Sequence, residues 1–309
     1  MRLRIVLVAL LLSACTSAPA STSPSAEVTQ SPSPTEVPSP TQRPSPTPIP
    51  IDEAMLARRF TVMVAGVDSS AARRARGEDE NTDALMVISV SADKSRIDIM
   101  SLPRDTVDIP MPDGSIYHRK INGIAQRFGI EGLRGAMSTL LGVPIDRYIR
   151  VDMDDFTWMV DAVGGIDVEV ATRIRDSQVH LSLDPGPAHL DGATALSYSR
   201  TRADSDYGRA ARQQQVMVAL ARKWLDPGLG ALIGTVRLLD SLQTDIGLDE
   251  ITTLLEIGRR SVSAKVTAIV LKPPQFSLFV GFEPGTTRGW VMIPDVPEIQ
   301  AYARSATAD

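Results

Sequence analysis

A stretch dominated by Ser, Thr and Pro over residues 16–50 confines any folded core of this chain to the residues that follow it. Its many Ser-Pro and Thr-Pro steps favour extended polyproline II backbone, and it lacks the apolar residues that a core requires. Fully extended, at roughly 3.1 Å per residue, it would reach on the order of 100 Å. We therefore expect a disordered linker over residues 16–50 and one folded domain over residues 51–309.

The residues before this linker have the pattern of a lipoprotein signal peptide, residues 1–15. Arg2 and Arg4 precede an apolar run over residues 5–12, far shorter than the roughly 20 residues that span a bilayer. Leu12-Ser13-Ala14-Cys15 then has the form of a lipobox. We expect lipidation of Cys15, which would hold an extracytoplasmic protein on the cell membrane. The alternative is an ordinary cleaved signal peptide with an incidental free thiol.

Composition limits the function further. The chain has 309 residues and a net charge of −5, so bulk positive charge does not hold it on nucleic acid. Any anion must be bound by a local cluster of Arg or Lys. Because there is one cysteine, an intrachain disulfide cannot form.

Apolar patterns after residue 51 alternate between strand and helix character. Strand patterns cover residues 60–67, 84–90, 96–102, 164–170 and 265–271, and helical patterns cover residues 133–141, 155–163, 209–225, 229–242, 249–260 and 297–305. Asp249 is the expected N-cap of the helix at 249–260. Because strands and helices intermix without an internal repeat, we predict a single α/β domain in which helices cover a central sheet.

The second and third expected strands are separated by the short polar turn at residues 91–95, which predicts a β-hairpin. A hairpin makes the sheet mixed rather than purely parallel. If the turn is centred near Lys94, pairing places Asp83 opposite Arg104 at the open end, within a residue or two.

Side chains suited to binding an anion gather between residues 200 and 213: Arg200, Arg202, Arg209, Arg212 and Gln213. Along an extended segment the first two would point to the same side, and the last three would share one helix face. Cations at a helix N-terminus oppose the macrodipole, at a cost on the order of a few tenths of a kcal/mol each. That cost makes sense if guanidinium groups and the helix end together hold an anion. The alternative is a solvated surface patch paired with Asp204 and Asp206.

Two carboxylates flank expected strands, Asp68 directly after the first and Asp83 directly before the second. Either alone is typical of a turn residue. Beside an arginine cluster, the two together indicate a divalent cation that bridges carboxylate and phosphate oxygens. Mg²⁺ usually takes one or two protein carboxylates plus substrate phosphate.

An ordered set of motifs resembles the LytR-CpsA-Psr domain. The motifs are Gly66-Val67-Asp68, Asp83, Ser101-Leu102-Pro103-Arg104-Asp105, Lys120-Ile121-Asn122, Gly164-Gly165-Ile166-Asp167-Val168, Leu190-Asp191-Gly192-Ala193-Thr194-Ala195-Leu196-Ser197-Tyr198-Ser199-Arg200-Thr201-Arg202, and Asp206-Tyr207-Gly208-Arg209 with Arg212-Gln213. The resemblance covers residues 60–225, and the chain after it is similar to the usual end of that domain. It implies one α/β/α catalytic domain over residues 51–309.

The resemblance also implies a function. Members of this family are extracytoplasmic phosphotransferases that move a glycopolymer from a polyprenyl-pyrophosphate carrier to peptidoglycan or another envelope acceptor. By position, Asp68 and Asp83 would hold Mg²⁺. The pyrophosphate would be held by Arg104, Arg200, Arg202, Arg209 and Gln213, with Arg212 on the same helix face, and an apolar tunnel would take the prenyl chain. The candidate catalytic residues are Arg104, Asp105 and Arg202, and the general base, Asp83 or Asp105, stays open.

The chain departs from the family pattern at two places. The family often has an Arg soon after the first Asp and another two residues before the second, where this chain has Ser69-Ser70 and Asn81. One pyrophosphate contact is therefore either missing or supplied by residues 71–80, which contain Arg73, Arg74 and Arg76. The three histidines, His118, His180 and His189, lack a spacing that indicates ligands, and we expect them at the surface.

Two other function classes stay open. One is a hydrolase of the same lipid pyrophosphates, with water as the acceptor. The other is a non-catalytic lipid- or wall-binding protein, although binding alone would not require paired metal carboxylates. A transcription factor is excluded by the export signal and the negative charge.

Overall fold

The computed structural model describes residues 50–78, 80–224 and 242–308. These residues belong to one compact unit, Pro48–Asp309. The expected signal peptide with Cys15, the expected linker up to residue 49 and nearly all of the helix expected at 229–242 lie outside the described residues. Among the described residues, no helix is both long and apolar enough to cross a bilayer.

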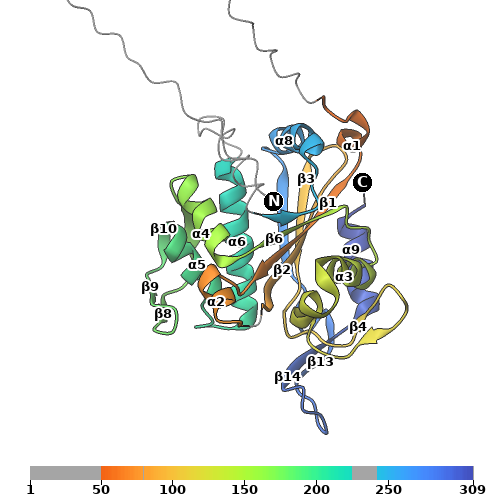
Figure 1. Cartoon of the computed structure of the whole chain (residues 1–309), viewed down its shortest axis with the longest axis vertical. Helices are drawn as coiled ribbons and strands as arrows, with labels where there is room; N and C mark the ends of the chain where they lie inside the picture. The colour runs from red at the N-terminus through yellow and green to blue at the C-terminus, as the bar shows by residue number, and fades with distance from the viewer. Residues whose placement is uncertain (1–49, 79, 225–241, 309) are drawn as a thin grey trace, which may run out of the picture. The chain divides into compact units, whose positions relative to one another are not determined.

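A six-stranded mixed sheet forms the centre of the domain (Figure 1). In spatial order its strands are β11 (Gln243–Thr244), β6 (Arg147–Val151), β1 (Phe60–Val67), β2 (Thr82–Val90), β3 (Arg96–Ser101) and β12 (Lys265–Val270). β2 pairs antiparallel with both β1 and β3, whereas β1–β6 and β3–β12 are parallel pairs. The α/β class, the mixed sheet and the β2–β3 hairpin are thus confirmed.

Helices cover both faces of this sheet. On one face, α3 (Ile124–Leu141) and α9 (Val296–Ala306) pack on strand residues such as Met63, Val87 and Met100 in the largest apolar cluster. On the other face, the long helix α6 (Asp206–Trp224) packs against Val64, Met86 and Ile99. The strand residues on the two faces alternate along the sequence, as the pleat of a sheet requires.

A second group of elements lies beyond α6. It contains α4 (Met153–Ala162), α5 (Gly192–Arg200) and the antiparallel pair of β7 (Ile166–Val170) and β10 (Gly186–Leu190), which share an apolar cluster with α6. The short strands β8 (Ile174–Asp176) and β9 (Leu181–Leu183) form a hairpin nearby.

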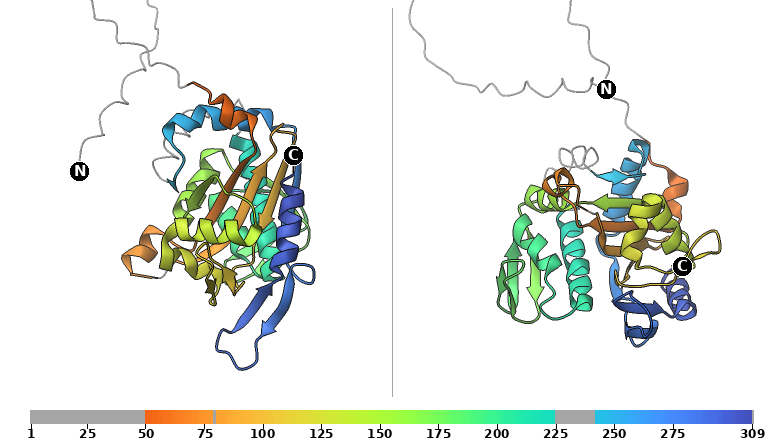
Figure 2. Two further views of the ribbon diagram at one scale, coloured as in Figure 1. Left: turned by 90° about the vertical axis from the view of Figure 1, so that its right-hand side faces the viewer. Right: turned by 60° about the horizontal axis from the view of Figure 1, so that its bottom comes forward.

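The two ends of the sheet carry different elements (Figures 1 and 2). At one end α1 (Glu53–Ala57) packs against α8 (Ile251–Arg260). At the other end lie α2 (Ala71–Ala75) and the hairpin of β13 (Ser277–Phe282) and β14 (Trp290–Pro294). β4 (Ile109–Pro110) pairs with β5 (Ile116–Tyr117) beside α3.

Several details differ from the sequence prediction, among them strands that no apolar pattern indicated, such as β6 in the central sheet. α3 begins nine residues earlier than the expected start at 133, and is interrupted at Gly129, whose φ of 74° is a backbone conformation that glycine adopts readily. Asp249 is not the N-cap of α8, because it lies inside a 3₁₀ turn, Leu248–Glu250. The carboxylate of Glu250 instead accepts the backbone N–H of Gly247 at 2.9 Å. A further difference concerns α5, which ends at Arg200 where an extended segment was predicted.

Candidate active site

The two predicted metal carboxylates lie at the ends of neighbouring strands. The register between β1 and β2 shifts, because Gly66 pairs with Ala84 while Val67 pairs with Thr82. Asp83 is therefore the extra residue of a β-bulge, a device that redirects a side chain at a strand end. Directly after β1, the backbone N–H of Asp68 donates to Asn81 O at 2.8 Å. Both carboxylates line the same cavity.

Asp83 faces three guanidinium groups. Arg104 Nη1 donates to both of its carboxylate oxygens, at 2.8 and 2.7 Å, so the predicted pairing of Asp83 with Arg104 is confirmed. Arg209 Nη1 and Arg202 Nη2 lie 3.8 and 4.0 Å from the same carboxylate. Burial acts to lower the pKa of Arg104, but the hydrogen bond and charge of Asp83 outweigh it, and the pKa is raised.

Arg209 is the most enclosed cation of the group. Its side chain is 5 % exposed, and its Nη2 lies 3.0 Å from the carboxylate of Asp206. Burial, together with the nearby charges of Arg202 and Arg104, lowers its pKa, although Asp206 and Asp83 act in the opposite direction. Its Nε is buried without a hydrogen-bond partner among the described residues. A buried donor in this state costs free energy that an anionic ligand would offset.

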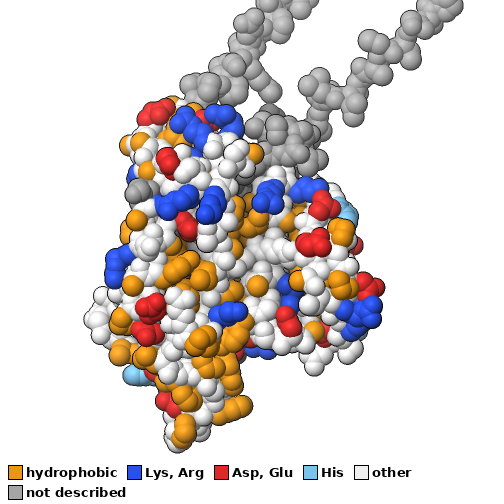
Figure 3. Space-filling view, turned by 180° about the vertical axis from the view of Figure 1, so that it is seen from behind, with side chains coloured by type: hydrophobic (Ala, Val, Ile, Leu, Met, Phe, Trp, Pro, Cys, Tyr) orange, Lys and Arg blue, Asp and Glu red, His pale blue; other side chains and the backbone are white. Residues whose placement is uncertain are grey.

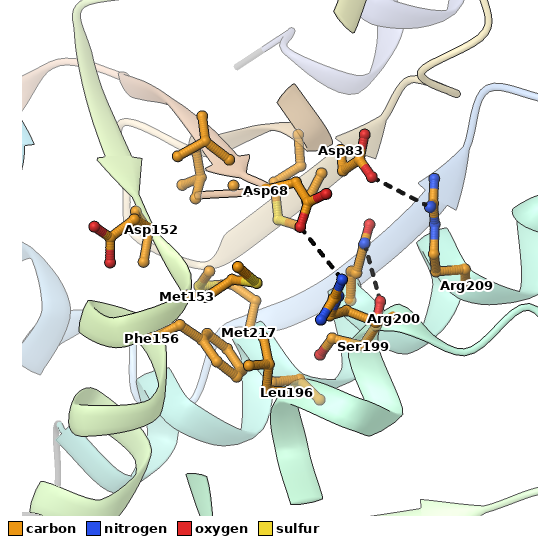
Figure 4. A pocket seen from close by; sticks show the side chains of 18 of the residues that line it. Asp68, Asp83, Asp152, Met153, Phe156, Leu196, Ser199, Arg200, Arg209 and Met217 are labelled. Carbon is orange, nitrogen blue, oxygen red and sulfur yellow. Dashed lines mark hydrogen bonds and ion pairs between the residues drawn. The ribbon is translucent and has the colours of Figure 1, made fainter. Parts of the chain in front are cut away.

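Arg200 and Arg202 reach the site from the end of a helix. We predicted an extended segment here, but Arg200 is the last residue of α5, which begins after Asp191. The Asp191 carboxylate accepts the Thr194 N–H at 2.8 Å and caps the helix. Asp is a preferred N-cap residue, so this helix start could have been predicted from the sequence. Arg200 Nη2 lies 3.3 Å from Asp68 Oδ1 (Figure 4).

Gln213 and Arg212 of α6 have different surroundings. Gln213 lines the cavity and donates to Ser199 O at 3.1 Å. Arg212 does not line it. Its Nη1 and Nη2 donate to the two oxygens of Asp204 at 2.9 Å each, and Nη2 also donates to Thr201 O at 2.6 Å. With its Nε donating to Tyr198 O at 3.2 Å, this guanidinium is engaged by the protein itself. The predicted contact of Arg212 with pyrophosphate does not fit this geometry, and we assign Arg212 the role of holding residues 198–204 in place.

Replacing Arg212 by methionine tests this assignment. We expect the free energy of unfolding to fall by about 2–4 kcal/mol, because two backbone carbonyls lose their donor and Asp204 loses its counter-ion. The Asp204→Asn variant keeps both carbonyl bonds and should lose about 1 kcal/mol or less, as for other half-exposed ion pairs. Thermal or urea unfolding would measure both. A normally stable Arg212→Met protein with weakened pyrophosphate binding would restore the original prediction.

The alternative of a solvated surface patch is wrong for Arg209 and Arg212, since both are buried. Its pairing is nevertheless present, because Asp204 contacts Arg212 and Asp206 contacts Arg209. Asp206 also lies 3.5 Å from Arg202 Nε.

The cavity itself joins a charged rim to an apolar interior. It has a volume of about 390 Å³ and lies between the sheet and helices α4, α5 and α6. The polar side chains at the strand ends give way to apolar ones, among them Val64, Met86, Phe156, Met159, Met217 and Leu220. Figure 4 shows Phe156, Met153, Met217 and Leu196 grouped beside Asp68 and Arg200. Such a cavity suits a ligand with an anionic head and an apolar tail.

Known proteins share the sequence pattern and the fold of this chain. Residues 27–276 match the LytR_cpsA_psr family. This chain belongs to that family. It is 27 % identical over 249 residues to the polyisoprenyl-teichoic acid–peptidoglycan teichoic acid transferase TagV of Bacillus subtilis (strain 168), covering 75 % of this chain and 62 % of TagV. The corresponding transferase TagU of Halalkalibacterium halodurans is 32 % identical over 198 residues, 62 % of each chain.

Solved structures of the family share the fold. The crystal structure of Bacillus subtilis TagV superposes with a TM-score of 0.66 and 25 % identity, over 82 % of this chain and 99 % of that one. The structure of TagT bound to LIIa-WTA superposes with a TM-score of 0.63 and 20 % identity, over 85 % and 93 %. In sequence, the chain matches less than two thirds of the length of TagV and TagU.

One departure from the LytR_cpsA_psr pattern is matched by a nearby side chain. The family often has an arginine soon after the first Asp, and this chain has Ser69-Ser70 there. Arg73 in α2 lies close to this position, with its Nη2 3.4 Å from Asp68 Oδ2. Asp68 thus lies between Arg73 and Arg200. The neighbouring Arg74 pairs instead with Asp152, the N-cap of α4, at 2.6 Å.

Asp105, the other candidate base, is not among the residues that line the cavity. Its carboxylate pairs with Lys120 at 2.7 Å, and its backbone oxygen accepts the N–H of Met292 at 3.1 Å. The catalytic role predicted for Asp105 is therefore not supported by its position, and it is better described as a residue that fixes the loop after Arg104. The three histidines are exposed, as expected.

The fit to a metal rests on Asp68 and Asp83. In the parts of the chain that the structure describes, no group of three or more His, Cys, Asp or Glu side chains could hold a metal ion. The cavity nevertheless offers two carboxylates from adjacent strands, beside guanidinium groups that can hold phosphate. Mg²⁺ often keeps few protein ligands and takes the rest from phosphate and water, so these residues fit it.

Proposed function

We propose that this chain is an extracytoplasmic, Mg²⁺-dependent phosphotransferase. It would move a glycopolymer from a polyprenyl-pyrophosphate carrier onto peptidoglycan or another envelope acceptor. The names of TagV and TagU, which describe transfer of polyisoprenyl-linked teichoic acid to peptidoglycan, support the reaction type. The lipobox at Cys15 supports a location outside the cytoplasm, on the membrane.

One observation carries the proposal. Arg209 is buried at the polar end of a cavity whose other end is apolar, and its Nε has no hydrogen-bond partner among the described residues. Ser199 Oγ, which is also buried and without such a partner, belongs to the same cavity. Phosphate oxygens at the rim would accept hydrogen bonds from the polar end of the cavity, and a prenyl chain would fill its apolar interior.

The chemistry follows from the rim. An acceptor hydroxyl oxygen attacks the phosphorus that carries the sugar, a new P–O bond forms, and the P–O bond to the bridging pyrophosphate oxygen breaks. Polyprenyl phosphate then leaves. Arg104, Arg202 and Arg209 neutralise the charge that develops on it, which is the main requirement of phosphoryl transfer. Mg²⁺ held by Asp68 and Asp83 would supply further neutralisation when bound.

The proton of the attacking hydroxyl must also leave. Asp83 pairs with Arg104, and Asp68 lies between Arg73 and Arg200. Carboxylates held by guanidinium groups or by a metal are poorly placed to act as general bases. In the proposed mechanism the proton therefore ends on an oxygen of the departing polyprenyl phosphate, because a phosphate monoester, with a second pKa of about 6, can accept it.

Filling the apolar interior tests the proposal. In the Met217→Trp variant, the larger ring would occupy space that we assign to the prenyl chain. We expect binding of a long-chain carrier to weaken about tenfold or more, the equivalent of roughly two methylene groups excluded from the cavity. A short-chain analogue with the same head should bind as before. The matched control is Met217→Leu, which conserves volume. Equal weakening for long and short chains would contradict the assignment.

A further inference from the structure

Helix α8 has an apolar inner face that packs against its neighbours, and apolar side chains on its opposite side are exposed. On the inner face, Ile257 packs with Met55, Leu56 and Phe60 in a cluster shared by α1, α8 and the start of β1. The outer side carries Leu255 of α8, Leu248 of the 3₁₀ turn before it and Val262 just after it, which are 40 %, 67 % and 66 % exposed. Their spacing of seven residues, two helical turns, aligns them along one stripe on and beside α8. Single exposed apolar residues are ordinary, but three aligned along one side of a helix and its flanking turns are not.

The chain enters the domain directly beside this stripe. Residue 50 is the first that the structure describes, and the backbone N–H of Asp52 donates to Thr253 Oγ1 in α8 at 2.8 Å. The Asp52 carboxylate then caps α1 by accepting the N–H groups of Ala54 and Met55. The described chain therefore begins beside α8, and the lipobox cysteine precedes it in the sequence.

Positive charge lies at one end of the stripe, beside Val262, whereas the exposed Asp249 lies at the other end, beside Leu248. Arg259 and Arg260, in the last turn of α8, both bind the single carboxylate of Glu256, at 2.7 and 2.8 Å. Two guanidinium groups thus share one carboxylate, and the side chains of Arg259 and Arg260 are 71 % and 49 % exposed. Figure 3 shows Lys and Arg side chains, with Asp and Glu side chains among them, at the end of the domain that holds α1 and α8. Arginines beside an apolar stripe are the pattern of helices that lie in the membrane interface.

β1 connects this end to the candidate site. Phe60, at the start of β1, packs in the α1–α8 cluster, and Asp68 follows its last residue. An eight-residue strand is about 26 Å long. α6 runs the opposite way, with Arg209 in its first turns and the apolar cavity residues Val216 and Leu220 nearer its C-terminal end. The charged rim therefore faces away from α8, and the apolar interior extends towards it.

We propose that the outer face of α8 is a membrane-docking surface, in which Leu248, Leu255 and Val262 enter the headgroup region of a lipid bilayer while Arg259 and Arg260 contact anionic headgroups. The surface would fix the orientation of the domain on the membrane. The rim of the cavity then lies tens of ångströms above the bilayer, with its apolar interior turned towards the lipid. This docking is independent of the reaction assigned above, because it requires neither the carboxylates nor the arginines of the cavity.

Vesicle flotation of the compact unit Pro48–Asp309 tests the docking surface. This unit contains the four apolar clusters of the domain and lacks the lipobox, so no covalent lipid contributes. We expect it to float with vesicles of phosphatidylcholine and phosphatidylglycerol, and less with phosphatidylcholine alone. The triple variant Leu248→Ser, Leu255→Ser, Val262→Ser should bind at least about tenfold more weakly.

The matched control lies at the opposite end of the domain. Leu278 and Phe282 of the β13–β14 hairpin are 71 % and 77 % exposed, and the double serine variant of these residues should float like the unmodified protein. Absence of vesicle binding, equal binding by the α8 variant, or loss of binding in the hairpin variant would each overturn the proposal. Two further readouts would also overturn it. A much lower melting temperature of the α8 variant would show that the stripe packs within the protein, and sedimentation that detects a dimer lost in that variant would assign the stripe to a second copy.

Discussion

Replacing Arg202 by alanine is expected to lower kcat/KM by about 10²–10³-fold, the range found when one preorganised donor to developing charge is removed. Arg202 lies at the rim of the cavity, within 4.0 Å of Asp83 and 3.5 Å of Asp206. Because its side chain is 47 % exposed, these ion pairs contribute little stability, about 1 kcal/mol or less. The variant should therefore fold normally, and the loss should appear in turnover, measured with a defined lipid-pyrophosphate substrate.

Two companions make this result specific. Arg202→Lys keeps the charge but lacks the planar fork that binds two phosphate oxygens, so it should recover only part of the activity. Arg222→Ala removes an exposed arginine from the far end of α6 and should leave kcat/KM unchanged. Near-normal turnover in both Arg202→Ala and Arg104→Ala would refute the assignment of these arginines to the pyrophosphate.

Removing the divalent cation is expected to have an effect at least as large. EDTA, or the double variant Asp68→Asn, Asp83→Asn, should reduce turnover by about 10³-fold, since a metal ion that neutralises phosphate charge contributes several kcal/mol to the transition state. Added Mg²⁺ should restore the EDTA-treated protein but not the variant. Calorimetric titration with Mg²⁺ in the presence of inorganic pyrophosphate should show binding to the unmodified protein that the variant lacks.

A matched carboxylate serves as the control for the metal experiment. Asp184 is exposed and contacts two arginines, Arg173 and Arg175, at 2.8 and 3.1 Å. Asp184→Asn should keep full activity and Mg²⁺ binding. Full activity in EDTA would remove Mg²⁺ from the account, although the arginine rim would remain.

Local patterns predicted the parts of the fold that depend on neighbouring residues. The β2–β3 hairpin followed from two apolar runs around a short polar turn, and its register then brought Asp83 to Arg104. The period of side chains in strands is two, so a short turn fixes which residues face each other. The same reasoning placed Asp68 at the end of the first strand, where the structure has it.

Contacts between distant segments were beyond this reasoning. The bulge leaves Asp83 of β2 without a partner in β1. It depends on how the two strands pair, and no residue type in the sequence predicts it. Arg212 and Arg209 have the same side chain on the same helix, yet one binds Asp204 and two carbonyls while the other borders the cavity. The difference between the two arginines arises from the position of residues 198–204, which surround the guanidinium of Arg212. α5 was a different kind of miss, because its N-cap, Asp191, was visible in the sequence.

The most direct test of the central proposal is product analysis by mass spectrometry. The purified unit Pro48–Asp309 would be incubated with a polyprenyl-pyrophosphate oligosaccharide, Mg²⁺ and peptidoglycan fragments. We predict an oligosaccharide joined to the acceptor by a phosphodiester, together with polyprenyl phosphate, and loss of both products in EDTA. Free phosphosugar without any acceptor adduct would instead make the protein a hydrolase, and lipid carrier that is bound but unchanged would make it a binding protein.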